Sequence, residues 1–205
     1  MREAAAAPSV DGLEPADVMR PGSADELAAA ARQRRAVVPV GGGRALGFGD
    51  APERYDVALS TTRLDRVVEF SQADLTCTVE AGITLERLQE ELGRAGQFLP
   101  LDPRSSPGHT LGGALASGWT GPLRLRFGSP REFVVGMRVA LPDGRLVRSG
   151  GRVVKNVSGY DLNKVHLGAL GTLGVIVEAS LKVFPRPPAE LALEHRPADV
   201  GAGWT

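Results

Sequence analysis

Residues 36–49 read Ala-Val-Val-Pro-Val-Gly-Gly-Gly-Arg-Ala-Leu-Gly-Phe-Gly, and this stretch decides the fold. Its β-branched first part, 36–40, predicts a short strand, and the glycines after it predict a loop. Consecutive glycines after a strand let several backbone N–H groups point into one concavity, which suits a phosphate or pyrophosphate. A flexible turn is the alternative, because glycine runs also occur in simple linkers.

Two common phosphate motifs do not fit this loop. Gly41 and Gly43 would need a glycine at position 46 to complete the dinucleotide fingerprint, but Leu46 stands there. The chain also lacks a Gly-x-x-x-x-Gly-Lys-Ser/Thr run. The sequence therefore excludes a Rossmann or P-loop site.

Two further glycine-rich segments follow along the chain. Residues 110–118, Thr-Leu-Gly-Gly-Ala-Leu-Ala-Ser-Gly, combine small side chains with two hydroxyls, which suits a flat ring or a phosphate. Close helix packing is the alternative interpretation of this segment. Residues 168–176, Gly-Ala-Leu-Gly-Thr-Leu-Gly-Val-Ile, place a glycine every three positions before a strand and indicate close backbone approach.

The pattern around these segments predicts an α+β fold in two lobes, divided near residue 75. Ser23 and Glu26 form a capping box that opens a helix, and Thr84 caps a second helix that ends before Gly96. A hairpin with an Asp-Gly turn is expected over 134–149. Further strands are predicted at 57–59, 67–70, 77–80 and 175–184.

The domain limits follow from the same pattern. Residues 20–188 form the predicted domain, with lobes over 20–75 and 76–188. Residues 1–19 are expected to be a mobile tail, and residues 189–205 are expected to begin a further region that this chain does not contain.

Composition excludes several classes of function. The 24 basic and 24 acidic residues cancel, which argues against binding nucleic acid or an anionic membrane surface. No apolar stretch approaches the roughly 20 residues of a membrane helix, so direct membrane insertion is not expected. The single Cys77 and the lack of a signal-like N-terminus favour a cytoplasmic location.

The remaining polar residues define no catalytic group. The three histidines share no metal-ligand spacing, so no metal is expected, and Ser105 and Ser106 lack the strained elbow of a hydrolase. Lys155, Asn156, Tyr160 and Asp161 form a polar cluster that suits either a ligand or an ordinary hydrogen-bonded turn. The catalytic residues therefore stay unknown.

Taken together, the glycine segments resemble the flavin-binding domain of the vanillyl-alcohol oxidase and p-cresol methylhydroxylase (PCMH) type. Residues 39–45 resemble the pyrophosphate loop of that family, 101–103 with 110–113 its second flavin segment, and 171–176 its third. The run 151–162 resembles the glycolate oxidase and D-lactate dehydrogenase branch, most closely the glycolate oxidase FAD-binding subunit.

The resemblance implies a two-lobed PCMH-type domain, with FAD between a small α/β lobe and a larger, mainly antiparallel-sheet lobe. It implies a flavin-dependent oxidoreductase that acts on a 2-hydroxy acid such as glycolate or D-lactate, with partner subunits that could associate it with a membrane. A noncatalytic FAD-binding or scaffold subunit is the main alternative, and a sugar-nucleotide reductase is a third. The implied cofactor-binding residues are Val40, Gly41, Gly42, Gly43, Arg44, Ala45, Asp102, Thr110, Leu111, Gly112, Gly113, Ser117, Gly118, Gly174, Val175 and Ile176.

The chain departs from the family pattern at two positions. Some members place a flavin-linking His in the pyrophosphate loop where this chain has Arg44, so noncovalent FAD is expected. Many members of the branch carry Glu where this chain has Leu170, which favours an accessory FAD-binding subunit over the larger catalytic one.

Overall fold

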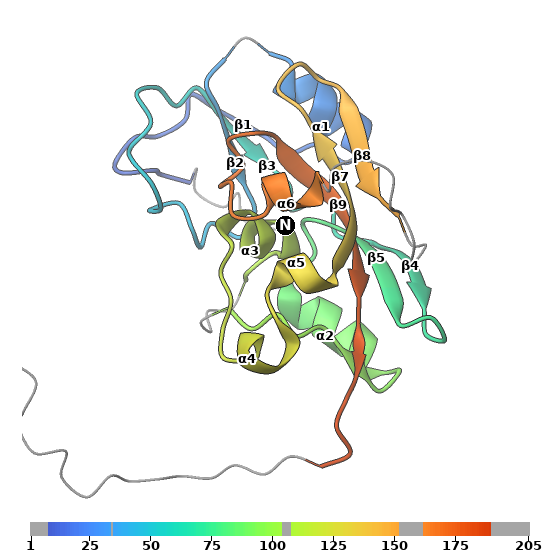
Figure 1. Ribbon diagram of the computed structural model, residues 1–205. Helices are drawn as coiled ribbons and strands as arrows, with labels where there is room; N and C mark the ends of the chain where they lie inside the picture. Colours follow the sequence, from blue (N-terminus) through green and yellow to red (C-terminus); the bar gives the residue numbers. More distant parts are fainter. Residues whose placement is uncertain (1–7, 34, 104–107, 152–161, 190–205) are drawn as a thin grey trace, which may run out of the picture.

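The computed structural model contains two main β-sheets with one helix packed against both (Figure 1). It describes residues 8–33, 35–103, 108–151 and 162–189. The polar cluster at 155–161, most of the branch-specific run 151–162 and all but the first residue of 189–205 lie outside the described residues.

The smaller sheet carries the glycine loop at the end of one of its strands. It pairs β1 (Asp17–Met19), β3 (Val57–Ser60) and β2 (Val37–Val40) in parallel, in the order β1-β3-β2. Because β3 lies in the middle, it is buried along its whole length, as expected for a central parallel strand.

Helix α1 (Ala24–Ala31) begins at the predicted cap. The Ser23 hydroxyl accepts a hydrogen bond from the Glu26 N–H at 3.2 Å, and the Glu26 carboxylate accepts one from the Gly22 N–H at 2.7 Å. The reciprocal bond thus goes to the residue before the cap. The helix ends at Ala31.

The expectation of a mobile tail over residues 1–19 is corrected for its described part, residues 8–19. Strand β1 pairs with β3, and Val10 is buried beside Tyr55 and Ala58. The Tyr55 hydroxyl also donates to the Pro8 carbonyl at 3.0 Å. An alanine-rich sequence without periodicity gave no sign of this pairing, because a three-residue strand is too short to show alternation.

The larger sheet is antiparallel throughout. Its order is β4-β5-β9-β7-β8, formed by β4 (Val67–Ser71), β5 (Thr76–Glu80), β9 (Val175–Lys182), β7 (Val134–Ala140) and β8 (Leu146–Gly150). The predicted hairpin is β7 and β8, closed by a turn in which Gly144 has a φ of 83°. Because β4 pairs with β5, the chain passes to the larger sheet between Ser60 and Val67, earlier than the division expected near residue 75.

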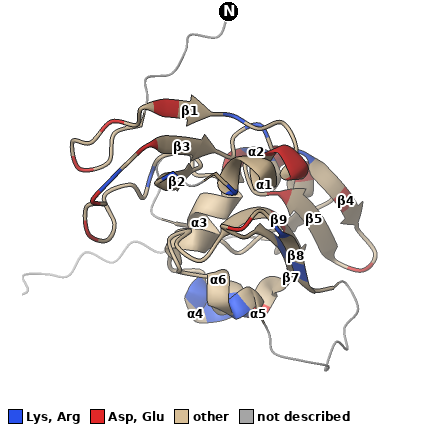
Figure 2. Ribbon diagram, turned by 90° about the horizontal axis from the view of Figure 1, so that it is seen from above, with Lys and Arg blue, Asp and Glu red and all other residues tan. Residues whose placement is uncertain are grey.

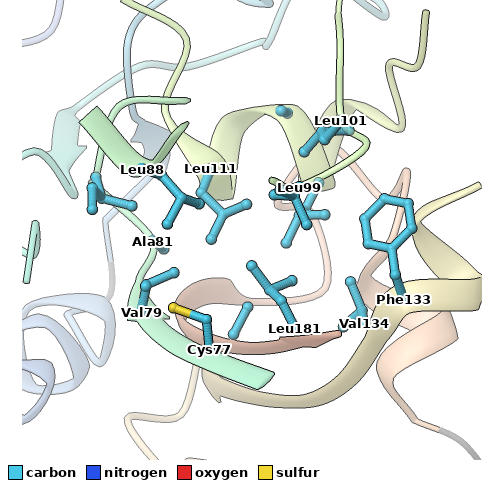
Figure 3. Packing of buried hydrophobic residues seen from close by; sticks show 14 of the residues in the cluster. Cys77, Val79, Ala81, Leu88, Leu99, Leu101, Leu111, Phe133, Val134 and Leu181 are labelled. Atoms are coloured by element: carbon cyan, nitrogen blue, oxygen red, sulfur yellow. The ribbon is translucent and has the colours of Figure 1, made fainter. Parts of the chain in front are cut away.

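The main hydrophobic core lies between the larger sheet and two helices. Leu88 of α2 (Leu85–Gly93) and Leu111 of α3 (Leu111–Ser117) point toward Val79 and Leu181 of the sheet (Figure 3). Each fully buried leucine stabilises the fold by about 1.5–3 kcal/mol. Burial also raises the pKa of the Cys77 thiol to about 12, so this side chain acts as a small apolar residue of the core.

A second core joins the two sheets. It packs Leu27 of α1 against Leu59 of β3 and Val177 of β9, and these three side chains are almost fully buried. Both ribbon views place α3 between the small sheet and the strands of the larger one (Figures 1 and 2). The remaining elements are β6 (Gln97–Phe98), α4 (Arg124–Phe127), α5 (Pro130–Phe133), α6 (Asn163–His166) and β10 (Phe184–Pro185), of which β6 and β10 pair.

Candidate functional site

The glycine loop after β2 packs directly against another backbone segment. A Cβ atom on Gly41 would overlap the Thr110 hydroxyl, and one on Gly42 would overlap the Gly108 carbonyl oxygen. Gly43 has a φ of 70°, which L side chains rarely adopt. These three positions therefore require glycine for packing and backbone conformation, whatever else the loop binds.

The same loop presents unused hydrogen-bond donors. The N–H groups of Gly41, Gly42 and Gly43 donate to no acceptor among the described residues. Arg44 follows them, and its guanidinium lies beside Gly108. Neighbouring amide donors with an adjacent cation are suited to an anion, because hydrogen bonds to a charged acceptor are about twice as strong as neutral ones.

The second glycine segment forms helix α3. The Thr110 hydroxyl caps it by accepting from the Gly113 N–H at 3.3 Å. A Cβ on Gly112 would lie 2.7 Å from the Cβ of Ala81, so this glycine permits close packing on the core. Gly113 faces a cavity, and its Cβ would lie 3.1 Å from the Thr110 hydroxyl oxygen. Close helix packing thus explains Gly112, whereas space for a ligand explains its neighbour Gly113.

The third glycine segment is fastened to the end of α3. The Gly168 N–H donates to the Leu115 carbonyl at 3.0 Å, and the Leu170 N–H donates to the Ala116 carbonyl at 2.8 Å. A Cβ on Gly171 would lie 3.1 Å from the Pro39 ring, so the segment also reaches β2. It thereby connects the two lobes beside the glycine loop.

Two adjoining cavities lie where the three segments meet. Their volumes are about 270 Å³ and about 50 Å³. Both are lined by Pro39 and Gly41 from the small lobe, by Gly113 and Ala116 from α3, and by Leu170 from the third segment. The structure therefore brings together segments that are far apart in sequence.

Most of the residues predicted to hold the cofactor line one or both cavities. These are Val40, Gly41, Gly42, Gly43, Arg44, Ala45, Thr110, Gly112, Gly113, Ser117, Val175 and Ile176. Their contact with a cofactor stays a prediction, but their convergence places them where one ligand could reach them all.

Four predicted residues lie outside both cavities. The Asp102 carboxylate accepts from the N–H groups of Gly121 and Leu123, each at 3.0 Å, and so orders the chain before α4. Leu111 is fully buried in the core. Gly118 ends α3 with a φ of 69°, and Gly174 has a φ of 151°. In the structure these residues support the elements that form the cavity walls.

Sequence reasoning missed an aromatic group at the larger cavity. Phe48 and His109 line it, and Trp119 contacts both rings. Phe48 lies between Gly47 and Gly49 of the loop, and a lone aromatic residue in a glycine run was the one available signal. The sequence pattern indicated no role for His109, which is one of three histidines without metal-ligand spacing. The described residues contain no group of three or more metal-ligating side chains.

Fold and site together define a class: a two-lobed domain with a glycine loop suited to an anion beside a cavity that both lobes line. Comparison with known proteins identifies the family. Residues 15–150 match the family of the FAD binding domain, and the chain belongs to that family. FAD is therefore its cofactor, as expected, and the resemblance inferred from the glycine segments is confirmed.

The relatives share one kind of chemistry. The chain is 42% identical over 130 residues to glycolate oxidase subunit GlcE of Escherichia coli, covering 63% of this chain and 37% of the relative. It is 35% identical to D-2-hydroxyglutarate dehydrogenase of Xanthomonas citri, covering 90% and 40%, and 32% identical to glycolate oxidase subunit GlcD of Bacillus subtilis, covering 87% and 39%. The chain thus spans about 40% of the length of these curated relatives.

A solved structure confirms the fold. An alkyldihydroxyacetonephosphate synthase superposes with a TM-score of 0.72 at 27% identity, over 87% of this chain and 34% of that one. Within the described residues, none of the helices is both long and apolar enough to span a bilayer.

Proposed function

We propose that this chain is the FAD-binding part of an oxidoreductase that oxidises a 2-hydroxy acid such as glycolate or D-lactate. One observation carries the proposal: the N–H groups of Gly41, Gly42 and Gly43, which donate to no acceptor in the described part of the chain, lie at the meeting point of three cavity-lining segments. The names of the relatives supply the substrate class.

Each segment has a separate task in this proposal. The N–H groups of Gly41, Gly42 and Gly43 donate to the pyrophosphate, and Arg44 balances its charge. Gly113 lets the cofactor approach the α3 backbone, and the third segment closes the cavity from the other lobe. When bound, FAD supplies the two-electron acceptor, while the protein supplies position and electrostatics. The cofactor is held noncovalently, since Arg44 occupies the position expected for a flavin-linking histidine.

The chain works together with other oxidase subunits. Relatives named as subunits of glycolate oxidase support this assignment. The groups that orient the hydroxy acid and remove its hydroxyl proton would then come from the rest of the assembly. A cytoplasmic location, with membrane association through partners, completes the proposal and rests on the single buried cysteine.

A noncatalytic FAD-binding subunit is the second candidate, favoured by the similarity to a relative named as a subunit, glycolate oxidase subunit GlcE. The two candidates differ in turnover. The full chain is loaded with FAD under anaerobic conditions and mixed with glycolate, D-lactate or NADPH while the flavin absorbance is recorded. Bleaching by a hydroxy acid supports the oxidoreductase, and bleaching by NADPH alone contradicts the substrate class. Bleaching that requires added partner subunits supports the catalytic role of an assembly, whereas no bleaching with them present supports the noncatalytic subunit.

A further inference from the structure

Three aromatic rings contact one another at the larger cavity: Phe48 and His109 line it, and Trp119 packs against both. The rings of Phe48 and Trp119 meet edge to face, with centroids 4.8 Å apart and planes at 86°. The His109 ring lies 5.7 Å from that of Trp119, at 48°. Phe48 and His109 both line the cavity, so this group of rings, the aromatic wall, faces the space that the glycine segments enclose.

The aromatic wall is assembled from separate pieces of chain. Phe48 belongs to the glycine loop, His109 precedes α3, and Trp119 follows it. Phe, Trp and Tyr make up only 5% of the sequence, so the contact of Phe48 with Trp119 beside one cavity is a local concentration. His109 is 5% exposed, whereas Phe48 remains 46% exposed and is the ring with surface still to cover.

The glycine loop indicates which end of the cofactor reaches this wall. FAD carries its two ring systems on opposite sides of the pyrophosphate. Gly41 lines both cavities, so a pyrophosphate on this loop directs one ring system into each. The three fused rings of the isoalloxazine need more space than adenine, and the cavities measure about 270 Å³ and about 50 Å³. The isoalloxazine therefore belongs on the side of Phe48.

We propose that Phe48, Trp119 and His109 form an aromatic subsite for the isoalloxazine ring of FAD. This inference rests on the proposed FAD-binding function and adds residues that the glycine segments do not contain. Aromatic contacts of this kind contribute about 0.5–1.5 kcal/mol beyond the area they bury. Loss of one ring is thus expected to change affinity by roughly tenfold, which corresponds to about 1.4 kcal/mol.

The first test separates the two ends of the cofactor. The full chain, its F48A variant and its G47A variant are titrated with FAD, FMN and ADP by isothermal calorimetry. G47A is the matched control, because its added Cβ meets nothing within 4 Å on the same loop. F48A is expected to weaken FAD and FMN about tenfold and leave ADP unchanged, while G47A binds all three as the wild type does. Equal weakening of ADP and FMN, or no weakening at all, would overturn the subsite.

The second test measures contact. An excited flavin is quenched by electron transfer from a tryptophan that touches or nearly touches it, but not from a phenylalanine. W119F is therefore expected to lengthen the fluorescence lifetime of bound FAD several-fold while the protein retains the cofactor. An unchanged lifetime at full FAD occupancy would overturn the subsite and leave the proposed function standing. A wild-type chain that binds no FAD would overturn both.

Discussion

The glycine loop after β2 and the glycine pair of α3 look alike in sequence, but their glycines have different structural roles. In the loop, Gly41 and Gly42 are required because a Cβ atom would overlap the Thr110 hydroxyl or the Gly108 carbonyl oxygen, and their N–H groups donate to no acceptor among the described residues. In α3 the Gly112 N–H donates to the Ala81 carbonyl and the Gly113 N–H donates to the Thr110 hydroxyl. The absent side chains matter instead, because Gly112 admits Ala81 and Gly113 leaves the cavity open.

The difference shows that a glycine-rich sequence indicates a close contact with the backbone, but it does not indicate whether the contact is with the protein itself or with a ligand. Only the direction in which a Cβ atom would point separates packing from ligand binding. Substitutions at these positions therefore test the comparison directly, because each is expected to affect stability and FAD affinity in a different proportion.

Gly42→Ala is expected to have the largest effect. Its Cβ would overlap the Gly108 carbonyl oxygen, a backbone atom, so the loop must leave its position. We expect the free energy of unfolding to fall by about 3 kcal/mol, the upper end for overpacking, and FAD binding to be lost as well. Thermal unfolding of the apo protein and a flavin titration measure the two effects. Wild-type stability with normal FAD binding would show that the loop is a free turn.

Gly113→Val is expected to reduce FAD affinity strongly and stability only slightly. Its side chain would project toward both cavities, while valine costs less helix propensity than glycine. We expect FAD affinity to fall at least thirtyfold, about 2 kcal/mol, with apo stability within about 1 kcal/mol of the wild type. Equilibrium urea unfolding and calorimetry check this pair of values. If affinity holds while stability collapses, Gly113 serves packing as Gly112 does.

Gly112→Ala is the matched neighbour on the same helix. Its Cβ would lie 2.7 Å from the Cβ of Ala81 and 3.0 Å from the Ala81 carbonyl oxygen, so the helix must shift on the core. We expect a net loss of about 1–2 kcal/mol in unfolding free energy, because overpacking outweighs the gain in helix propensity. Urea unfolding of the apo protein is the measurement. A variant more stable than the wild type would place the tight packing elsewhere.

Arg44→Gln tests where the charge complementarity lies. Arg44 belongs to the loop, and α3 contains no charged residue, so the salt dependence of binding should come from the loop. We expect Arg44→Gln to weaken FAD about fivefold to tenfold, about 1 kcal/mol, and to flatten the dependence on salt. Ser117→Ala on α3 is the control and should keep the full salt dependence. If FAD affinity depends equally on salt concentration in the wild type and in Arg44→Gln, Arg44 does not contribute to the anion site.

The smallest expected effect concerns the third segment and pH. Burial lowers the pKa of His166, which lies two residues before that segment, below its ordinary value near 6.5. As the pH falls, the unfolded chain binds a proton at this histidine before the folded chain does. The free energy of unfolding is therefore highest above about pH 6.5 and decreases as the pH falls toward the pKa of His166 in the folded protein. Urea unfolding between pH 8 and pH 5 should show a shallower decline in His166→Gln. A steeper decline of the unfolding free energy in the variant would contradict the expected direction of the His166 effect.

Much of the fold followed from local sequence signals. The caps at Ser23 and Thr84 and the Asp-Gly hairpin were predicted because each is a short-range rule satisfied within a few residues. Strand β1 was missed, since its pairing with β3 depends on residues about forty positions away. The lobe boundary was placed too late because the partner of β4 could not be known from its own sequence.

The site was predictable to the extent that it is made of glycine. The three segments were identified by composition, but the roles of Gly112 and Gly113 depend on the contacts of helix α3, which no local pattern specifies. The aromatic wall had one local signal, Phe48 within a glycine run, but the contact of Phe48 with Trp119 forms only after the loop and the helix have packed.

The most direct test of the account is the visible absorption spectrum of the freshly purified protein, taken before and after acid precipitation. We predict flavin bands in the native protein that move fully into the supernatant, because the converging glycine segments hold FAD without a covalent bond. Bands that stay with the pellet would contradict noncovalent binding. A colourless protein that takes up no added FAD would contradict the central claim that these three segments form the cofactor site.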